Sequence, residues 1–75
     1  MSGIDQWEST YKYAKKLLQN AMSFGDMYAK AKNLKEAWNA TCLLPSYYYG
    51  KDELLADIKR YANSCGIDLD KVSGY

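Results

Sequence analysis

The stretch LLPSYYYGKDELLADI, residues 43–58, decides the fold, because a helix stop and a helix start stand within it. Proline disfavours the α conformation in the residue before it, so Pro45 predicts that the upstream helix ends by about residue 41. Gly50 closes the loop, and the acids behind Lys51 lie where the helix dipole favours negative charge. The stretch therefore predicts two helices joined by a loop that carries three consecutive tyrosines.

Upstream of this stretch, apolar residues recur every three or four positions, which is the spacing of one helix face. The first set is Ile4, Trp7, Tyr11, Ala14, Leu18 and Ala21. It predicts a helix over residues 5–22, and the segment SFGD at 23–26 predicts a break in which Ser23 caps a second helix over 24–41. A second interpretation stays open, because the apolar spacing continues almost in heptad register: one kinked helix over 5–42, which would need a partner chain to cover it.

A third apolar set, downstream of the loop, predicts a helix over residues 52–65. Its members are Leu54, Leu55, Ile58, Tyr61, Ala62 and Cys65. Gly66 followed by Ile67 predicts a left-handed stop of the Schellman type, and Asp68 can cap one short C-terminal helical turn. The prediction is an all-α fold, a small three-helix domain over residues 1–75.

Chain length and charge limit the classes of function. A chain of 75 residues buries only about 60–65% of its unfolded surface, so oligomerisation is a ready way to add stability. The net charge of +1 does not by itself favour nucleic acid. Without a secretory signal or a membrane-length apolar run, the two cysteines predict a cytoplasmic setting with free thiols, in which Cys42 and Cys65 are small buried hydrophobes.

The absence of histidine argues against most catalytic mechanisms. It removes the commonest general base, the commonest zinc ligand and every Ser/His or Cys/His nucleophile pair. The acids of the third predicted helix alternate with basic residues, which is typical of a solvated face. Asp68 and Asp70 lack the glycine and the glutamate of a calcium loop, and no glycine-rich phosphate loop occurs. The sequence predicts a protein that is not an enzyme and that uses no metal or cofactor.

The C-terminal segment IKRYANSCGIDLDKVSGY, residues 58–75, offers a first nucleic-acid alternative. Ala62, Gly66 and Val72 have the small-residue, glycine and apolar spacing of a helix-turn-helix unit. The second helix of that unit would turn Asp68 and Asp70 toward DNA phosphates, so a plain glycine cap is the favoured interpretation.

Lysines on the first two predicted helices offer a second alternative, the binding of single-stranded nucleic acid. They are Lys12, Lys15, Lys16, Lys30, Lys32 and Lys35. Aromatic rings between amines suit a strand whose bases stack at about 1–3 kcal/mol each while lysines neutralise its phosphates. Lysine on an outer helix face is also the ordinary way in which a helix stays hydrated, so the pattern fits both interpretations.

The tyrosine loop, defined as residues 43–50, gives the leading hypothesis. Three adjacent tyrosines cannot all point the same way, so we expect one or two to pack beneath the loop and at least one to be exposed. Exposed tyrosine is a favoured anchor of protein interfaces. The predicted partner-binding residues are Tyr47, Tyr48, Tyr49 and Lys51.

The run DMYAKAKNLKEAWNATCLLPSYYYGKDELLADIKRYANSCGID, residues 26–68, resembles the N-terminal helical portion of RecT-type phage single-strand annealing proteins. The features that match are a helix stop, a glycine–lysine pair and a glycine–aliphatic turn, at Leu43, Leu44 and Pro45, at Gly50 and Lys51, and at Gly66 and Ile67. The annealing core that follows in that family is not in this sequence. The resemblance therefore implies a phage-type accessory or interaction segment, one that meets single-stranded DNA or a nucleoprotein complex, and not annealing activity.

The resulting hypothesis is a small non-enzymatic binding module of phage type, similar in class to small inhibitors of host machinery, that acts through contact with a protein or nucleoprotein partner. Binding of nucleic acid through the lysines is the alternative. A third interpretation is a structural homo-oligomer in which the stripes of Trp7 and Trp38 cover each other between chains. No membrane partner is expected.

Overall fold

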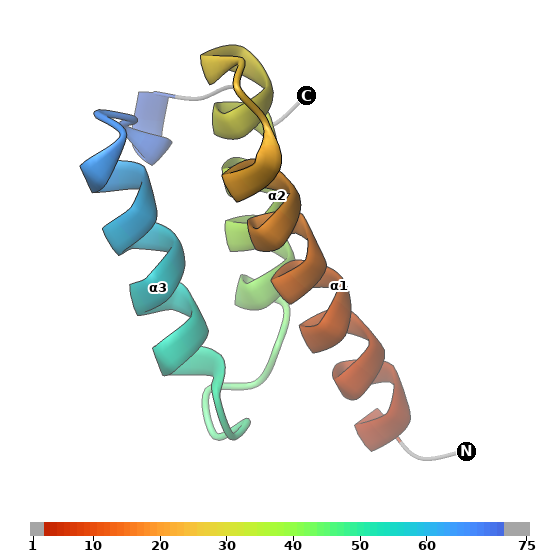
Figure 1. Cartoon of the computed structure of the whole chain (residues 1–75). Coiled ribbons are helices and arrows are strands. Elements are labelled where there is room, and N and C mark those ends of the chain that lie inside the picture. The colour runs from red at the N-terminus through yellow and green to blue at the C-terminus, as the bar shows by residue number, and fades with distance from the viewer. Residues whose placement is uncertain (1–2, 72–75) are drawn as a thin grey trace.

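The computed structural model describes the backbone of residues 3–71 and the side chains of residues 6–71. These residues form three α-helices and one 3₁₀ turn, and contain no strand: α1 (Gly3–Ser23), α2 (Met27–Cys42), α3 (Lys51–Ser64) and η1 (Leu69–Lys71). The predicted all-α fold is confirmed. The helices run up, down and up, so α1 and α3 are parallel to each other and antiparallel to α2 (Figure 1). None of the helices in the described part of the chain is long and apolar enough to cross a membrane.

The chain breaks between α1 and α2 at residues 24–26, which excludes a single kinked helix. Asp26 is the N-cap of α2: its backbone is extended and its carboxylate accepts a hydrogen bond from the N–H of Ala29 at 3.0 Å. The prediction that Ser23 caps this helix is wrong. Ser23 is the last residue of α1, and its hydroxyl donates back to the carbonyl of Gln19 at 3.2 Å. A carboxylate at the cap also complements the positive end of the α2 dipole.

The loop between α2 and α3 ends at Gly50, whose φ of +94° is left-handed. Two successive turns make up the loop: the N–H of Tyr48 donates to the carbonyl of Pro45 at 3.0 Å, and the N–H of Lys51 donates to the carbonyl of Tyr48 at 3.2 Å across Gly50. The acids of the first turn of α3 lie as predicted. Gly50 has no side chain to cap α3, so the start of this helix depends on a backbone shape that favours glycine.

The end of α3 is the predicted Schellman stop. Gly66 has a φ of +75°, and the N–H of Ile67 donates to the carbonyl of Ala62 at 2.8 Å while that of Gly66 donates to Asn63 at 3.1 Å. Ile67 then packs against the core. The predicted short C-terminal turn is η1, a three-residue 3₁₀ helix. Within residues 67–71 no second helix of a helix-turn-helix unit forms, and Val72 lies outside the described residues.

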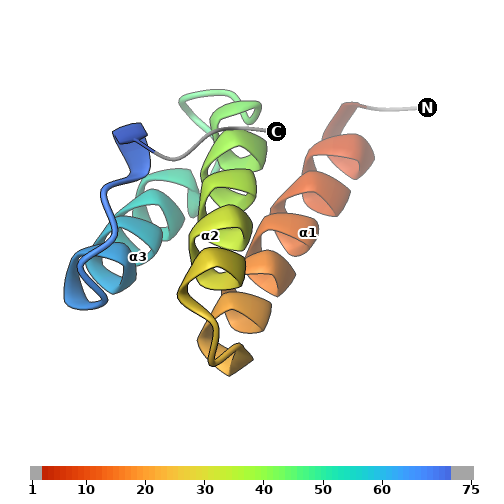
Figure 2. The same ribbon diagram turned by 90° about the horizontal axis from the view of Figure 1, so that it is seen from above.

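The core is small and rich in alanine. The buried hydrophobic residues of the described chain are Ala14, Leu17, Leu18, Ala21, Leu34, Ala37, Ala40, Leu44, Leu54, Ile58 and Ala62. Small side chains let the helices approach closely, and α2 lies between the other two (Figure 2). Contact between α1 and α2 is the most extensive and contact between α1 and α3 the slightest.

At the end of α2 the structure buries Thr41 and exposes Cys42. Thr41 is fully buried, and its hydroxyl donates to the carbonyl of Ala37 at 2.7 Å, so the buried oxygen is satisfied. One residue further is a rotation of about 100° around the helix, which places Cys42 outward. The prediction of a buried Cys42 is wrong; Cys65 is half-buried, and both thiols are free.

Candidate binding surface at the tyrosine loop

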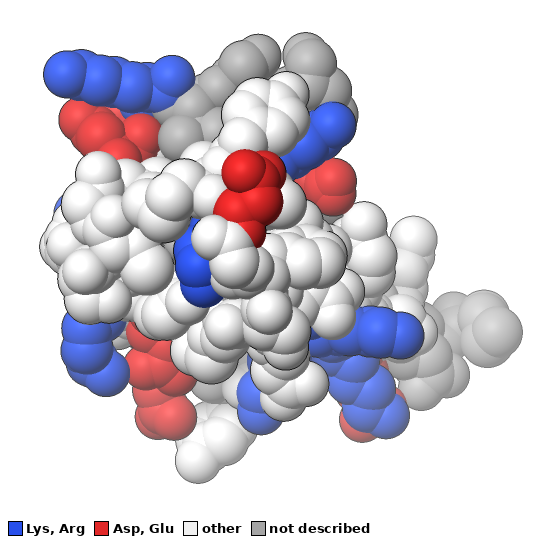
Figure 3. All heavy atoms as spheres, turned by 45° about the horizontal axis from the view of Figure 1, so that its top comes forward, with Lys and Arg blue, Asp and Glu red and all other residues white. Residues whose placement is uncertain are grey.

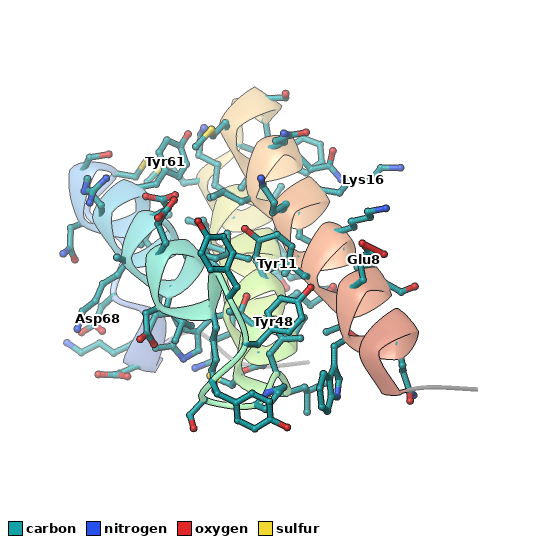
Figure 4. The ribbon with its side chains drawn as sticks, turned by 90° about the horizontal axis from the view of Figure 1, so that it is seen from below. Glu8, Tyr11, Lys16, Tyr48, Tyr61 and Asp68 are labelled. Carbon is teal, nitrogen blue, oxygen red and sulfur yellow. The ribbon has the colours of Figure 1, made fainter. Side chains whose placement is uncertain are left out.

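Tyr48 is the one loop tyrosine that packs inward. Its ring lies 5.6 Å from that of Tyr11, tilted by 48°, and 6.4 Å from that of Trp7, nearly perpendicular to it. Tyr11 and Tyr48 point toward each other between α1 and α3 (Figure 4). Edge-to-face and tilted ring pairs at these distances stabilise beyond their buried area. Tyr48 therefore fixes the tyrosine loop to α1.

Tyr47 and Tyr49 point outward. Tyr49 is 94% exposed and Tyr47 is 77% exposed, although one edge of the Tyr47 ring contacts Trp7 at 5.9 Å between centroids. The expectation that one or two tyrosines pack beneath the loop and at least one is exposed is confirmed. Tyr48, a predicted partner-binding residue, is the ring that packs inward, so the exposed rings of the predicted set are Tyr47 and Tyr49. Leu43 is also exposed, so the loop presents three large apolar side chains to solvent.

Contacts inside the loop leave it little freedom. A Cβ added to Gly50 would lie 2.9 Å from the hydroxyl oxygen of Tyr11, so the Tyr11 ring rests directly on the glycine backbone. The ammonium of Lys51 donates to the carbonyl of Leu44 at 2.7 Å, across the base of the loop. Leu44 itself is buried. The structure thus places Lys51, a predicted partner-binding residue, as a brace inside the loop rather than as an outward-pointing charge.

The lysines of the nucleic-acid alternative fall into two groups. Lys30 donates to the carbonyl of Ala21 at 3.0 Å and to the hydroxyl of Tyr61 at 2.6 Å, and Lys35 donates to the carbonyl of Leu69 at 3.0 Å. Neither α1 nor α2 has a basic residue in its last turn, and Lys30 supplies a cation to the carbonyl end of α1 from the neighbouring helix.

The other four lysines of that set are exposed. They are Lys12, Lys15, Lys16 and Lys32. Lys16 points away from α3 (Figure 4). Lys15 lies over the ring of Tyr11, with 5.5 Å between its ammonium and the ring centroid. Three exposed lysines therefore lie on α1, whereas the ammonium groups of Lys30 and Lys35 bond to other elements of the fold.

Two members of this surface, Trp7 and Tyr11, are not among the predicted site residues. Their spacing of four marks one helix face, which the sequence predicts as core or, in the homo-oligomer interpretation, as a contact between chains. The sequence holds one indication of this contact: two large aromatic residues close to the start of a helix can pack against aromatic rings from a distant loop. The sequence does not show which loop that is.

A second group of exposed apolar side chains lies at the opposite end of the bundle, around the turn from α1 to α2. Its members are Met22, Phe24, Met27 and Tyr28. The face that brings this turn forward is mostly uncharged, with an acidic and a basic side chain near its centre and the other charged side chains toward its edge (Figure 3).

The described side chains contain no group of three His, Cys, Asp or Glu residues that could hold a metal ion. Comparison of the chain with protein-family models, with curated proteins and with solved structures found no match. The candidate site therefore rests on its own geometry, an ordered loop with exposed tyrosines beside an exposed set of α1 lysines.

Proposed function

We propose that this chain is a small non-enzymatic binding protein of the cytoplasm that docks on a protein or nucleoprotein partner through the tyrosine loop. The supporting observation is the arrangement of the three tyrosines: Tyr48 packs against α1, while Tyr47 and Tyr49 are exposed on the same loop. Large exposed rings on a fixed backbone are the usual composition of an interface anchor.

The order of the loop favours this use of the tyrosines. Binding costs about 0.5–1.5 kcal/mol for each side chain that must be immobilised, and more when a loop must be ordered. Here the Gly50 backbone beneath Tyr11 and the bond from Lys51 to the carbonyl of Leu44 hold the loop before any partner arrives. Most of the entropy cost of ordering the loop is then incurred when the chain folds and not when it binds, so contacts of the exposed rings contribute more fully to affinity.

Selection from a displayed random-peptide library against the whole chain tests the proposal, because the library itself supplies the binding partners. We expect selected peptides to bind the parent chain and to lose at least about tenfold in affinity for Tyr47→Ala or Tyr49→Ala. Tyr28→Ala is the matched control, because Tyr28 is 75% exposed at the other end of the bundle. The proposal would be contradicted by peptides whose affinity is unchanged by both loop substitutions and falls with Tyr28→Ala.

Single-stranded nucleic acid is the second candidate, and the exposed amines of α1 support it. Lys12, Lys15 and Lys16 are exposed on one helix, and Tyr13 between them is 53% exposed. This is the interleaving of amines and rings that suits a stacked strand. Lys30 and Lys35 are excluded from the candidate contact set because their amines are used within the fold.

A salt series with a labelled oligothymidylate tests this candidate. If the three α1 lysines each neutralise a phosphate, affinity should fall roughly 20-fold between 50 and 200 mM salt. Replacing Lys12, Lys15 and Lys16 by alanine should abolish that dependence, whereas Lys32→Ala on α2 should not. Absence of binding at 50 mM salt would leave the protein partner as the only candidate.

A further inference from the structure

An open groove runs between α1 and α3. Both helices pack on α2 and have little contact with each other, so α2 covers only one side of the pair (Figure 2). The part of the groove toward the end of α3 has a volume of about 330 Å³. It is lined by Leu18, Met22, Asp57, Arg60, Tyr61 and Ser64. The lining residues come from α1 and α3 alone.

The floor of the groove is an apolar stripe along α1. Trp7, Tyr11, Leu18 and Met22 are spaced by four, seven and four, which places them on one helix face. Leu18 is nearly buried, Met22 is half exposed, and Trp7 and Tyr11 are partly covered by the rings of the tyrosine loop. The stripe therefore extends from the tyrosine loop to the far end of α1.

The two walls of the groove differ in their charged side chains. On α1, Lys15 stands beside Tyr11 and is exposed. On α3, Asp57 lines the groove, and Glu53 lies one helical turn before it on the same side and is exposed. Arg60 pairs with Asp57 at 3.3 Å, which leaves Glu53 as the acid of this wall without a cation from its own helix.

The charged residues of the two walls lie at the same height. The Tyr11 hydroxyl rests on Gly50 at the start of α3, and Leu18 lines the same part of the groove as Asp57 and Tyr61. Lys15 lies between Tyr11 and Leu18 on α1, and Glu53 lies between Gly50 and Asp57 on α3, so the two charges belong to the same stretch of the groove. Because α1 and α3 are parallel, a two-fold axis along the groove would bring the α1 wall of one copy against the α3 wall of a second copy at this same height (Figure 1).

We propose that two copies of this chain pair groove to groove about a two-fold axis parallel to α1 and α3, with Lys15 of each copy opposite Glu53 of the other. The surface is self-complementary in charge under this operation, which is what an isologous interface requires. The pairing would cover the stripe of Trp7, Tyr11 and Met22. It would also extend a core in which five of eleven buried hydrophobic residues are alanines.

This arrangement does not depend on the function proposed for the tyrosine loop, but it has a consequence for it. An axis parallel to the helices places both loops at the same end of the dimer. Two identical anchors on one face would raise the avidity for a repeated or symmetric partner.

Reciprocal charge swaps provide the test, with mass measured by light scattering and analytical ultracentrifugation over a concentration series. In a homodimer of the Lys15→Glu variant, both attractive pairs between position 15 of one copy and position 53 of the other become pairs of like charge. The same is true of a homodimer of the Glu53→Lys variant. We expect each variant alone to dimerise about 30-fold more weakly than the parent chain. An equimolar mixture of the two variants should restore the parent affinity as a dimer of one copy of each, which native mass spectrometry separates from homodimers by mass. Restoration also shows that both variants fold.

Lys16→Glu and Asp52→Lys are the matched controls, because each makes the same charge change one residue away on an exposed outward position. We expect both to dimerise like the parent chain. Three results would overturn the proposal: a parent chain that stays monomeric at the highest concentration, a dimer insensitive to both swaps, or a mixture that does not recover. A monomeric parent would instead assign the groove to a helix of another protein.

Discussion

Both ends of the bundle expose aromatic side chains, but the two ends differ in the contacts that hold those side chains in place. At one end, the tyrosine loop presents Tyr47 and Tyr49 while a third ring, Tyr48, is packed against α1. At the other end, only three residues separate α1 from α2, and Phe24 in this turn and Tyr28 at the start of α2 are exposed. The ring–ring contacts of the described residues all lie at the first end.

The difference shows that exposure alone does not make a binding surface. Scattered apolar side chains are common on soluble proteins and need no function. The tyrosine loop differs because buried contacts hold its backbone, so its exposed rings are presented in one arrangement. The following substitutions compare matched positions at the two ends.

The largest difference is expected between Tyr48→Ala and Tyr28→Ala. Tyr48→Ala removes the ring contacts to Trp7 and Tyr11 and should lower the free energy of unfolding by about 2–3 kcal/mol. Tyr28 is 75% exposed, so its removal should change stability by less than about 0.5 kcal/mol. Urea unfolding followed by circular dichroism, at one fixed chain concentration, measures both. Equal effects at the two positions would mean that the tyrosine loop is no better held than the turn.

The glycines of the two connections give the next comparison. Gly50→Ala combines a left-handed backbone with a Cβ 2.9 Å from the Tyr11 hydroxyl, and should cost about 2 kcal/mol. Gly25 has no positive φ and no atom within 4 Å of an added Cβ. Gly25→Ala should therefore be neutral or stabilise by up to about 1 kcal/mol, because it restricts only the unfolded chain. Thermal unfolding of both variants tests this; a destabilised Gly25→Ala chain would contradict the geometry of the turn.

Helix number, helix type and the stop at Gly66 could be predicted from the sequence because each depends on local chemistry. Apolar spacing, proline and the glycine–isoleucine pair act within a few residues of one another. The errors arose where two local solutions compete. Ser23 and Asp26 are both good caps, and in the fold α1 extends through Ser23 and leaves the cap of α2 to Asp26.

The candidate site was only partly predictable because its contacts are distant in sequence. The sequence indicates that the three tyrosines cannot all be buried, but the choice of Tyr48 depends on Trp7 and Tyr11, about forty residues earlier. The lysines present the same difficulty. Lys30 and Lys51 look like ordinary surface charges, and only the fold brings each ammonium to a carbonyl of another segment.

Lys30 and Lys51 give the comparison with the smallest expected effects, because each lysine holds one end of the bundle through a hydrogen bond to a carbonyl. Lys51→Met leaves the carbonyl of Leu44 without its donor and should cost about 1 kcal/mol. Lys30→Met removes donors to the Ala21 carbonyl and the Tyr61 hydroxyl, and should cost about 1–2 kcal/mol. Methionine keeps the length and apolar stem of lysine, so the difference reports the ammonium, and Lys16→Met on the exposed face of α1 is the control.

The two lysine substitutions should then separate in their effect on binding. Loss of the Lys51 brace loosens the loop that carries Tyr47 and Tyr49, so peptides selected on the parent chain should bind Lys51→Met more weakly even where the chain is fully folded. Lys30→Met acts at the far end and should lower stability while leaving affinity at the tyrosine loop unchanged. If both variants bind equally well under folded conditions, the loop does not need its brace, and the affinity of its rings does not come from preorganisation.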